Sequence, residues 1–139
     1  MLNLKVKPLP PQLATGFHGG GGGSKIGEEW TPTGCMCGAL AAGVLVIGVL
    51  YGRKSPKESR YGCAAHLSGY LHKRFEEELG AKCCSMLRPF YKKIDPDNSC
   101  NAIYKKGAEL AVEVVLSAPE LVAECRMPRS LQRFVERKG

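Results

Sequence analysis

The chain has 139 residues, of which 44% are hydrophobic, and it carries a formal net charge of +7. This length corresponds to a single domain with a small core. The positive charge is spread over short clusters such as Arg53-Lys54 and Lys92-Lys93. A diffuse excess of this kind is typical of a solvated surface, so we expect no nucleic-acid partner.

Seven cysteines are a high number for a chain of this length. The first twelve residues are too polar and too rich in proline for a secretory signal peptide. An odd number of cysteines without such a signal argues against a secreted disulfide scaffold. We therefore expect a reducing cytoplasm, where clustered cysteines indicate metal, Fe–S or redox chemistry.

The N-terminal 30 residues are expected to be irregular, and no strand pattern is convincing anywhere in the chain. Gly19 to Gly23 are five consecutive glycines, which could cradle a phosphate group. Ser24-Lys25 follows them, whereas a phosphate-binding P-loop needs Gly-Lys-Ser/Thr. The run therefore favours a flexible connector or a close crossing of two backbone segments.

Residues 37–51 are expected to form the first long helix. Cys37, Leu40 and Val44 recur at helical spacing and the other positions are also apolar, so the helix should be buried on all sides. Two interpretations remain open. The run is either the central helix of a soluble bundle or a membrane span over residues 33–52, a stretch that no charge interrupts. The amphipathic helices that follow need an apolar partner, which favours the soluble bundle.

The next helix is predicted to begin at Ser55-Pro56-Lys57-Glu58, a capping box with proline in the first turn, and to end before Gly80. Cys63 and His66 share one of its faces. They are either a metal-ligand pair or, as we favour, a buried thiol beside a partly exposed histidine. The apolar face of this helix recurs every four residues and should pack on the core: Leu67, Leu71, Phe75 and Leu79.

The last third of the chain is predicted to be helical in shorter pieces. Residues 83–87 should form a helical turn that Pro89 ends. A helix of four turns should extend from about Cys100 to about Leu116, and another capping box at residues 117–120 should open a short helix through about Cys125. The inward residues of the longer helix are expected to be Ile103, Leu110, Val114 and Val115.

The predicted fold is therefore an all-α bundle of about four to five helices around the buried Gly/Ala-rich helix. Its parts are an irregular Pro/Gly-rich arm over residues 1–30, a helical cysteine-bearing domain over residues 31–126 and a basic tail over residues 127–139.

Three cysteines lie at predicted helix starts, namely Cys37, Cys84 and Cys100. The positive end of a helix dipole favours the thiolate, which is both the nucleophile and the metal ligand. Cys63 and Cys125 lie inside or at the end of helices, and there a thiol behaves as a small hydrophobe. We therefore expect the first three to carry the chemistry, as redox-active thiols or as metal ligands.

The spacing of the cysteines matches no standard zinc pattern, because the chain has no C-x-x-C pair. Cys35 and Cys37 form a C-x-C that could be a redox pair or supply two ligands. Cys83 and Cys84 are neighbours, so one of them is expected to be a bystander. Such loose spacing suits an Fe–S cluster or a thiolate metal site built from several helices, and equally suits cysteines that only pack. No hydrolase signature accompanies the histidines.

A series of short motifs between about residues 14 and 116 has the order and spacing of a known family. Cys37-Gly38-Ala39-Leu40, the apolar run and Tyr51-Gly52-Arg53 resemble the CGA signature of the C_GCAxxG_C_C family of redox-active proteins. Upstream, residues 16–20 resemble its FGGG stretch. Phe75-Glu76-Glu77 with Gly80, Cys84 and Leu87 resembles its third-cysteine segment, and Cys100 resembles its final cysteine.

The resemblance implies a small helical protein that is redox-active through four cysteines, with an Fe–S cluster or another metal as its cofactor, encoded near transporters. Cys37, Cys84 and Cys100 would be three of the four. The family's first cysteine precedes the glycine-rich stretch, whereas residues 1–13 contain none, which indicates a truncated or divergent N-terminus. The glycine that the family has after its Gly-Ala pair is also displaced by one position, to Gly43.

Cys35, Cys83 or a second subunit would then have to supply the fourth ligand, so a homo-oligomer is one possibility that the resemblance raises. The sequence thus predicts a redox-active protein that binds a cluster or metal, or cycles between dithiol and disulfide, with an unidentified redox partner. The alternatives are a non-catalytic accessory protein, for example of a transporter or another membrane protein, and a single-pass membrane protein anchored by residues 33–52.

Overall fold

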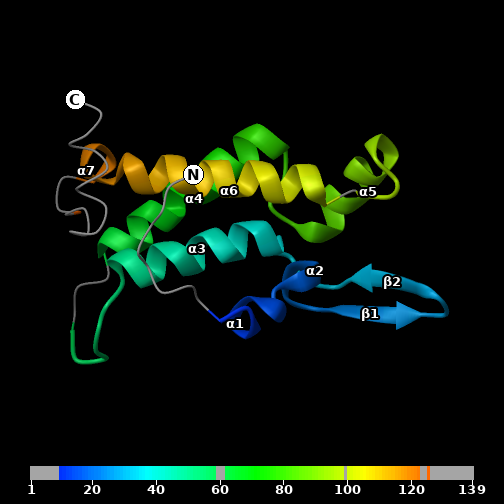
Figure 1. The fold of residues 1–139 in the computed structure, drawn as a ribbon, viewed down its shortest axis with the longest axis horizontal. Coiled ribbons are helices and arrows are strands. Elements are labelled where there is room, and N and C mark those ends of the chain that lie inside the picture. The colour runs from blue at the N-terminus through cyan, green and yellow to red at the C-terminus, as the bar shows by residue number, and fades with distance from the viewer. Residues whose placement is uncertain (1–9, 59–61, 99, 123–124, 126–139) are drawn as a thin grey trace.

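The structure is a computed structural model that describes residues 10–58, 62–98, 100–122 and 125. Three long helices lie side by side, and a small hairpin and a shorter helix lie at one end of them (Figure 1). The long helices are α3 (Gly38–Tyr51), α4 (Gly62–Leu79) and α6 (Asn101–Leu116). The other elements are α1 (Gln12–Thr15), α2 (His18–Gly21), β1 (Gly23–Ile26), β2 (Glu29–Pro32), α5 (Cys84–Ile94) and α7 (Ala118–Leu121).

The core lies where α3, α4 and α6 pack against one another, which confirms the expected all-α bundle for the described residues. The α4 positions at spacing four are buried as predicted, and Leu67, Leu71 and Phe75 are fully so. All four predicted inward residues of α6 are also buried. Burial of large aliphatic and aromatic side chains contributes about 1.5–3 kcal/mol each, so these stripes account for the association of the helices.

Close contact between the helices depends on Gly43 in the middle of α3. A Cβ atom built at Gly43 would lie 2.6 Å from Leu71 Cδ2 and 3.3 Å from Ala111 Cβ. Leu71 belongs to α4 and Ala111 to α6, so this glycine lets both neighbours approach α3 at the same level.

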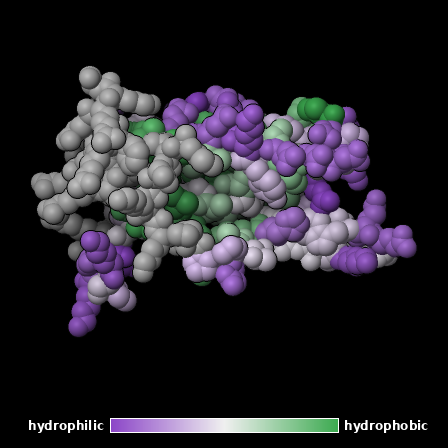
Figure 2. Space-filling model, in the orientation of Figure 1, coloured by the Kyte–Doolittle hydropathy of each residue, from purple (hydrophilic) through white to green (hydrophobic). Residues whose placement is uncertain are grey.

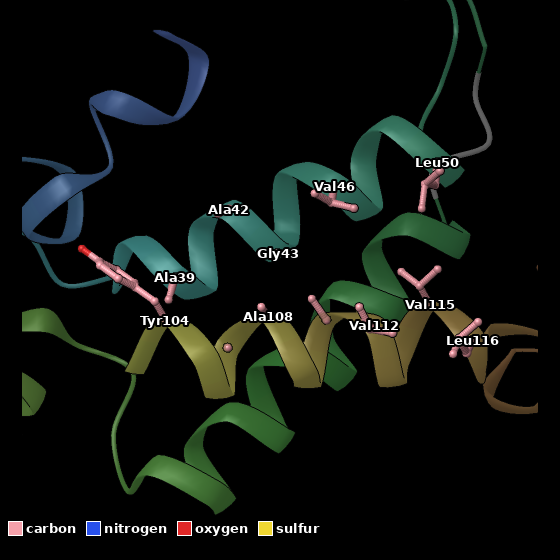
Figure 3. A pocket seen from close by; sticks show the side chains of 12 residues that line it. Ala39, Ala42, Gly43, Val46, Leu50, Tyr104, Ala108, Val112, Val115 and Leu116 are labelled. Atoms are coloured by element: carbon pink, nitrogen blue, oxygen red, sulfur yellow. The ribbon is translucent and has the colours of Figure 1, made fainter. Parts of the chain in front are cut away.

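One side of α3 is open, so the prediction that this helix is buried on all sides is wrong. Leu40, Ala41 and Ile47 face the core, but Val46 and Val49 are exposed. The open side is one wall of a groove of ≈ 350 Å³, which we call the apolar groove, and α6 supplies the other wall (Figure 3). Figure 2 shows hydrophobic surface in the middle of the same face, with hydrophilic surface above and below it. The elements that pack against α3 leave this one side of the apolar helix uncovered.

The membrane-span interpretation of residues 33–52 is also wrong. No helix within the described residues is long and apolar enough to cross a membrane. The helix in this stretch, α3, has 14 residues. At about 1.5 Å per residue it is too short for a hydrocarbon core of about 30 Å.

The glycine run does bring two backbone segments together, as one of its two interpretations predicted. Gly20 has φ +80°, and a Cβ atom there would lie 2.6 Å from the Gly34 carbonyl oxygen. The expectation that the chain contains no strand is wrong, because β1 and β2 form an antiparallel hairpin in which Lys25 pairs with Trp30. The strands have only four residues each, too few for an alternating pattern to be evident in the sequence.

Several predicted helix boundaries need correction. The capping-box residues Ser55 and Glu58 form a turn outside the helix, in which Glu58 N–H donates to the Ser55 carbonyl oxygen at 3.1 Å; α4 is described over Gly62–Leu79. Helix α5 continues through Pro89 to Ile94, although proline has no N–H group to donate to the preceding turn. Cys84 and Leu87, on the turn before Pro89, are buried. The short helix α7 ends at Leu121 and does not reach Cys125. Residues 1–9 of the arm and the basic tail lie outside the described residues.

Candidate functional site

Three helices begin around one pocket of ≈ 290 Å³, which we call the thiol pocket. Cys37 is the N-cap residue of α3, Cys84 is the first residue of α5, and Cys100 is the N-cap residue of α6. All three line the pocket. All seven cysteines lie in the described part of the chain, and these three are the free ones. The structure therefore brings together the three cysteines that the sequence singled out.

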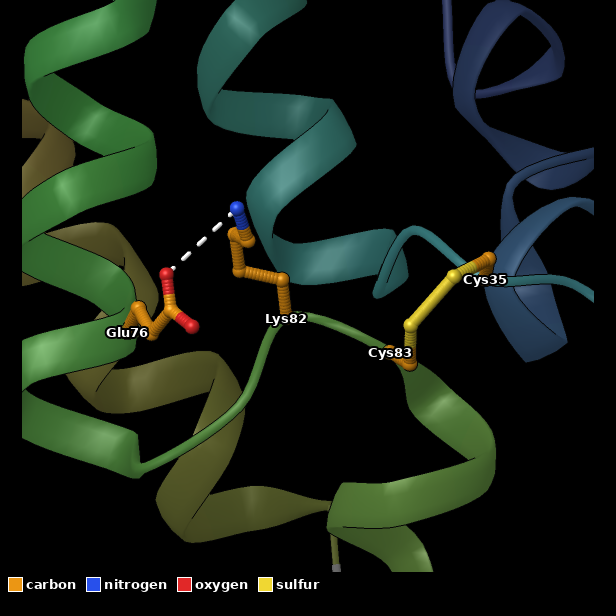
Figure 4. The surroundings of a disulfide bond; sticks show 4 residues. All are labelled: Cys35, Glu76, Lys82 and Cys83. Atoms are coloured by element: carbon orange, nitrogen blue, oxygen red, sulfur yellow. Dashed lines mark ion pairs between the residues drawn. A yellow bond between two sulfur atoms is a disulfide. The ribbon is translucent and has the colours of Figure 1, made fainter.

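The start of α3 and the start of α5 are held together in two ways. The Cys37 N–H group donates a hydrogen bond to the Lys82 carbonyl oxygen, with a donor–acceptor distance of 2.7 Å. A disulfide, which we call the outer disulfide, joins Cys35 to Cys83, with a Cα–Cα distance of 4.2 Å (Figure 4). Cys35 and Cys83 were candidate metal ligands; in this structure they are bonded to each other and have no free thiolate to donate.

The pKa values of the buried thiols Cys37 and Cys84 are raised, whereas we expected the helix starts to lower them. Burial raises the pKa of Cys37, although the backbone amides of Ala39 and Leu40 act to lower it. Burial also raises the pKa of Cys84, with smaller contributions in the same direction from Cys37 and Cys100. The prediction that the helix starts favour the thiolates of Cys37 and Cys84 is therefore wrong in its net effect, because desolvation of a charged sulfur outweighs the helix amides.

Polar groups that the sequence analysis did not single out complete the pocket. The Arg88 guanidinium lies 4.8 Å from the centre of the Trp30 ring and donates to the Trp30 carbonyl oxygen at 3.4 Å. The charge of Arg88 acts to lower the pKa of Cys84. The His18 ring stacks on Trp30 with centroids 4.6 Å apart. Thus the arm expected to be irregular supplies part of the site.

Tyr104 forms another wall of the thiol pocket. Burial raises its pKa, and the adjacent side chain of Cys100 does so as well. Its hydroxyl therefore stays protonated and can donate a hydrogen bond. No sequence motif marks Tyr104 or Arg88. His18 lies inside the stretch of residues 16–20 that resembles the family's FGGG motif, and Trp30 is the only tryptophan in the chain.

The two remaining cysteines form a second disulfide, which we call the core disulfide. It joins Cys63 in α4 to Cys125, with a Cα–Cα distance of 5.5 Å. Cys125 is fully buried and Cys63 packs against the core. Cys63 is therefore neither a metal ligand paired with His66 nor a free buried thiol beside it, and both interpretations were wrong. The odd number of cysteines did not exclude structural bridges, since three thiols remain free beside two disulfides.

The family resemblance implies an Fe–S cluster or another metal. The positions of the side chains that could act as metal ligands test whether this site fits one. Within the described residues, no three or more Cys, His, Asp or Glu side chains are grouped so that they could hold a metal ion. Cys37, Cys84 and Cys100 share a pocket without forming such a group. The residues in this arrangement therefore do not fit a thiolate-bound metal.

These features define a mostly helical protein with a pocket of free thiols at the meeting point of three helix starts. The sequence profile of the family described as "Putative redox-active protein (C_GCAxxG_C_C)" matches residues 9–114. The matched segment covers 106 of the 139 residues (9 to 114 inclusive), so the chain belongs to this family. No curated protein and no solved structure matches the chain.

Proposed function

We propose that this protein is a thiol–disulfide redox protein and that Cys37, Cys84 and Cys100 are its redox-active thiols. The observation that supports this is their placement: three helix starts far apart in the sequence bring their free thiols to one pocket, while the other four cysteines are paired. Cysteines that only fill space have no reason to gather beside an arginine and a tyrosine.

Cys37 and Cys84 are the pair that cycles between dithiol and disulfide; we call them the inner pair. The outer disulfide and the hydrogen bond from Cys37 to Lys82 hold the segments that carry them. The Cys37 thiolate attacks a sulfur of the oxidising disulfide and expels one thiolate. The Cys84 thiolate then attacks the Cys37 sulfur of this mixed disulfide and expels the second thiolate. Two electrons leave the protein, and the two thiol protons go to the expelled thiolates.

Cys100 is the third thiol of the site and lies next to the Tyr104 hydroxyl. Tyr104 can donate a hydrogen bond to a thiolate at this position and so stabilise it during exchange. The proposed compartment is the cytoplasm. The proposed partner is a dithiol or disulfide protein, and an accessory role beside a transporter is the alternative.

The test begins with an anaerobic purification, followed by visible absorption and metal analysis of the same sample. We expect a colourless, metal-free protein that loses thiols reversibly in mixtures of reduced and oxidised glutathione, with alkylation and mass mapping assigning the loss to the thiol pocket. Stoichiometric iron and sulfide would overturn the proposal in favour of an Fe–S protein.

Variants assign the reaction to residues. Changing Cys37 or Cys84 to serine should abolish the reversible reaction, whereas changing Cys100 to serine should only weaken it, because Cys100 is not one of the two exchanging thiols. The double variant C63S/C125S is the matched control and should retain it. Equal losses in all of these variants would contradict the assignment.

A further inference from the structure

The outer disulfide is accessible, whereas the inner pair is not. Cys35 is exposed and Cys83 is half-buried. By contrast, only 4% of Cys37 and 9% of Cys84 are exposed. Thiol–disulfide exchange requires an in-line approach of one sulfur to another, so a protein partner can reach the outer disulfide more easily than the inner pair.

The two pairs of cysteines are carried by the same two backbone segments. Cys35 lies two residues before Cys37, and Cys83 lies next to Cys84. The 4.2 Å between the Cα atoms of Cys35 and Cys83 brings these segments into contact (Figure 4). Since consecutive Cα atoms are about 3.8 Å apart, all four sulfurs lie in one small region of the protein.

We propose that the outer disulfide is a relay that exchanges electrons between the inner pair and an external disulfide or dithiol. This inference rests on the proposed function of the inner pair. It assigns to Cys35 and Cys83 a redox role in place of a structural one, and it makes their exposed bond the site where the partner reacts.

The internal step conserves electrons and protons. The Cys37 thiolate attacks one sulfur of the outer disulfide, which forms a mixed disulfide and releases one outer thiolate. The Cys84 thiolate attacks the Cys37 sulfur, which completes the inner disulfide and releases the second outer thiolate. The two protons lost by the inner thiols go to the released thiolates. An external disulfide then accepts two electrons from the outer dithiol and restores the outer bond.

The raised pKa values of Cys37 and Cys84 make such a relay useful. A thiol that is mostly protonated reacts slowly with a dilute external oxidant, because the thiolate is the nucleophile. A disulfide fixed beside it acts as an oxidant at high effective concentration. The core disulfide offers no such route, since Cys125 is fully buried and lines no part of the thiol pocket.

The experiment follows oxidation of the inner pair by oxidised glutathione in three proteins: the unaltered chain, C35S/C83S and C63S/C125S. Samples are quenched at intervals with an alkylating reagent and mapped by tandem mass spectrometry. We expect the inner disulfide to form at least about tenfold more slowly in C35S/C83S, and at the unaltered rate in C63S/C125S. An unaltered rate in C35S/C83S would overturn the relay while leaving the proposed function intact. Failure of the inner disulfide to form in the unaltered chain would overturn both proposals.

A trapping variant keeps the test decisive if C35S/C83S does not fold. In C84S, the Cys37 thiolate can attack the outer disulfide but the second step is blocked. We expect a mixed disulfide from Cys37 to Cys35 or Cys83, with one outer thiol set free. Trypsin together with cyanogen bromide, which cleaves after Met36, separates Cys35 from Cys37 and identifies the bond. A sample in which Cys37 stays entirely free would contradict the relay.

Discussion

The two disulfides of this protein close loops of similar length but lie in different surroundings. Cys35 and Cys83 are 48 residues apart, and Cys63 and Cys125 are 62 apart. Loop-closure entropy alone would assign each bond about 4 kcal/mol, so sequence separation does not distinguish them. Their surroundings do: the core disulfide packs among apolar side chains, whereas the outer disulfide is exposed and adjoins free thiols. Location, not loop length, therefore separates a structural bond from an exchanging one.

The largest expected effect is on stability. Replacement of the core disulfide in C63S/C125S should lower the free energy of unfolding by about 4 kcal/mol from loop entropy, and by about 1 kcal/mol more for the hydroxyl at the fully buried position 125. Urea unfolding followed by circular dichroism measures this loss. C35S/C83S is the matched comparison and should lose less, since its hydroxyls can be hydrated. A larger loss in C35S/C83S would reverse the comparison.

The next largest effect should be the difference between the rates at which the outer and the core disulfide are reduced. Under a limiting concentration of dithiothreitol, the outer disulfide should open at least about tenfold faster than the core disulfide, because Cys35 is exposed whereas Cys125 is fully buried and Cys63 half-buried. Timed alkylation and mass mapping of the Cys35 and Cys125 peptides give both rates. If the two bonds open together, then exposure is not what distinguishes them.

The smallest effect concerns the pH dependence of the inner pair. Since burial raises the pKa of Cys84, its thiolate forms only at a pH above that of an ordinary cysteine, and its alkylation should accelerate into the alkaline range. The charge of Arg88 acts to lower this pKa, so R88Q should raise it further and slow alkylation of Cys84 severalfold near neutral pH.

Cys37 in the same protein provides the internal control. Arg88 is not among the groups that shift the pKa of Cys37, so its alkylation profile should stay unchanged in R88Q. Equal slowing of both cysteines would indicate a general change in access to the pocket, not an electrostatic effect of Arg88.

The sequence by itself determined the features that depend on near neighbours. The spacing of Leu67, Leu71 and Phe75 predicted the buried face of α4, because helical periodicity places every fourth residue on one side. In the same way, helix-start patterns placed Cys37, Cys84 and Cys100 at the ends of three helices, which the structure brings to one pocket.

Only the tertiary structure decided the features that depend on segments far apart in the chain. Which cysteines pair depends on which distant segments meet: Cys35, before α3, bonds to Cys83, before α5, and Cys63, in α4, bonds to Cys125, after α7. No rule based on sequence spacing predicts these pairs. Burial, which raises the pKa of Cys37 against the pull of its own helix start, arises from neighbouring elements. The same holds for Trp30 and Arg88, which are 58 residues apart and meet beside the thiols. The periodicity of a sequence reports on contacts within one or two helical turns. The burial and the bonding partner of a cysteine depend on segments far away in the chain that pack against it in the folded protein.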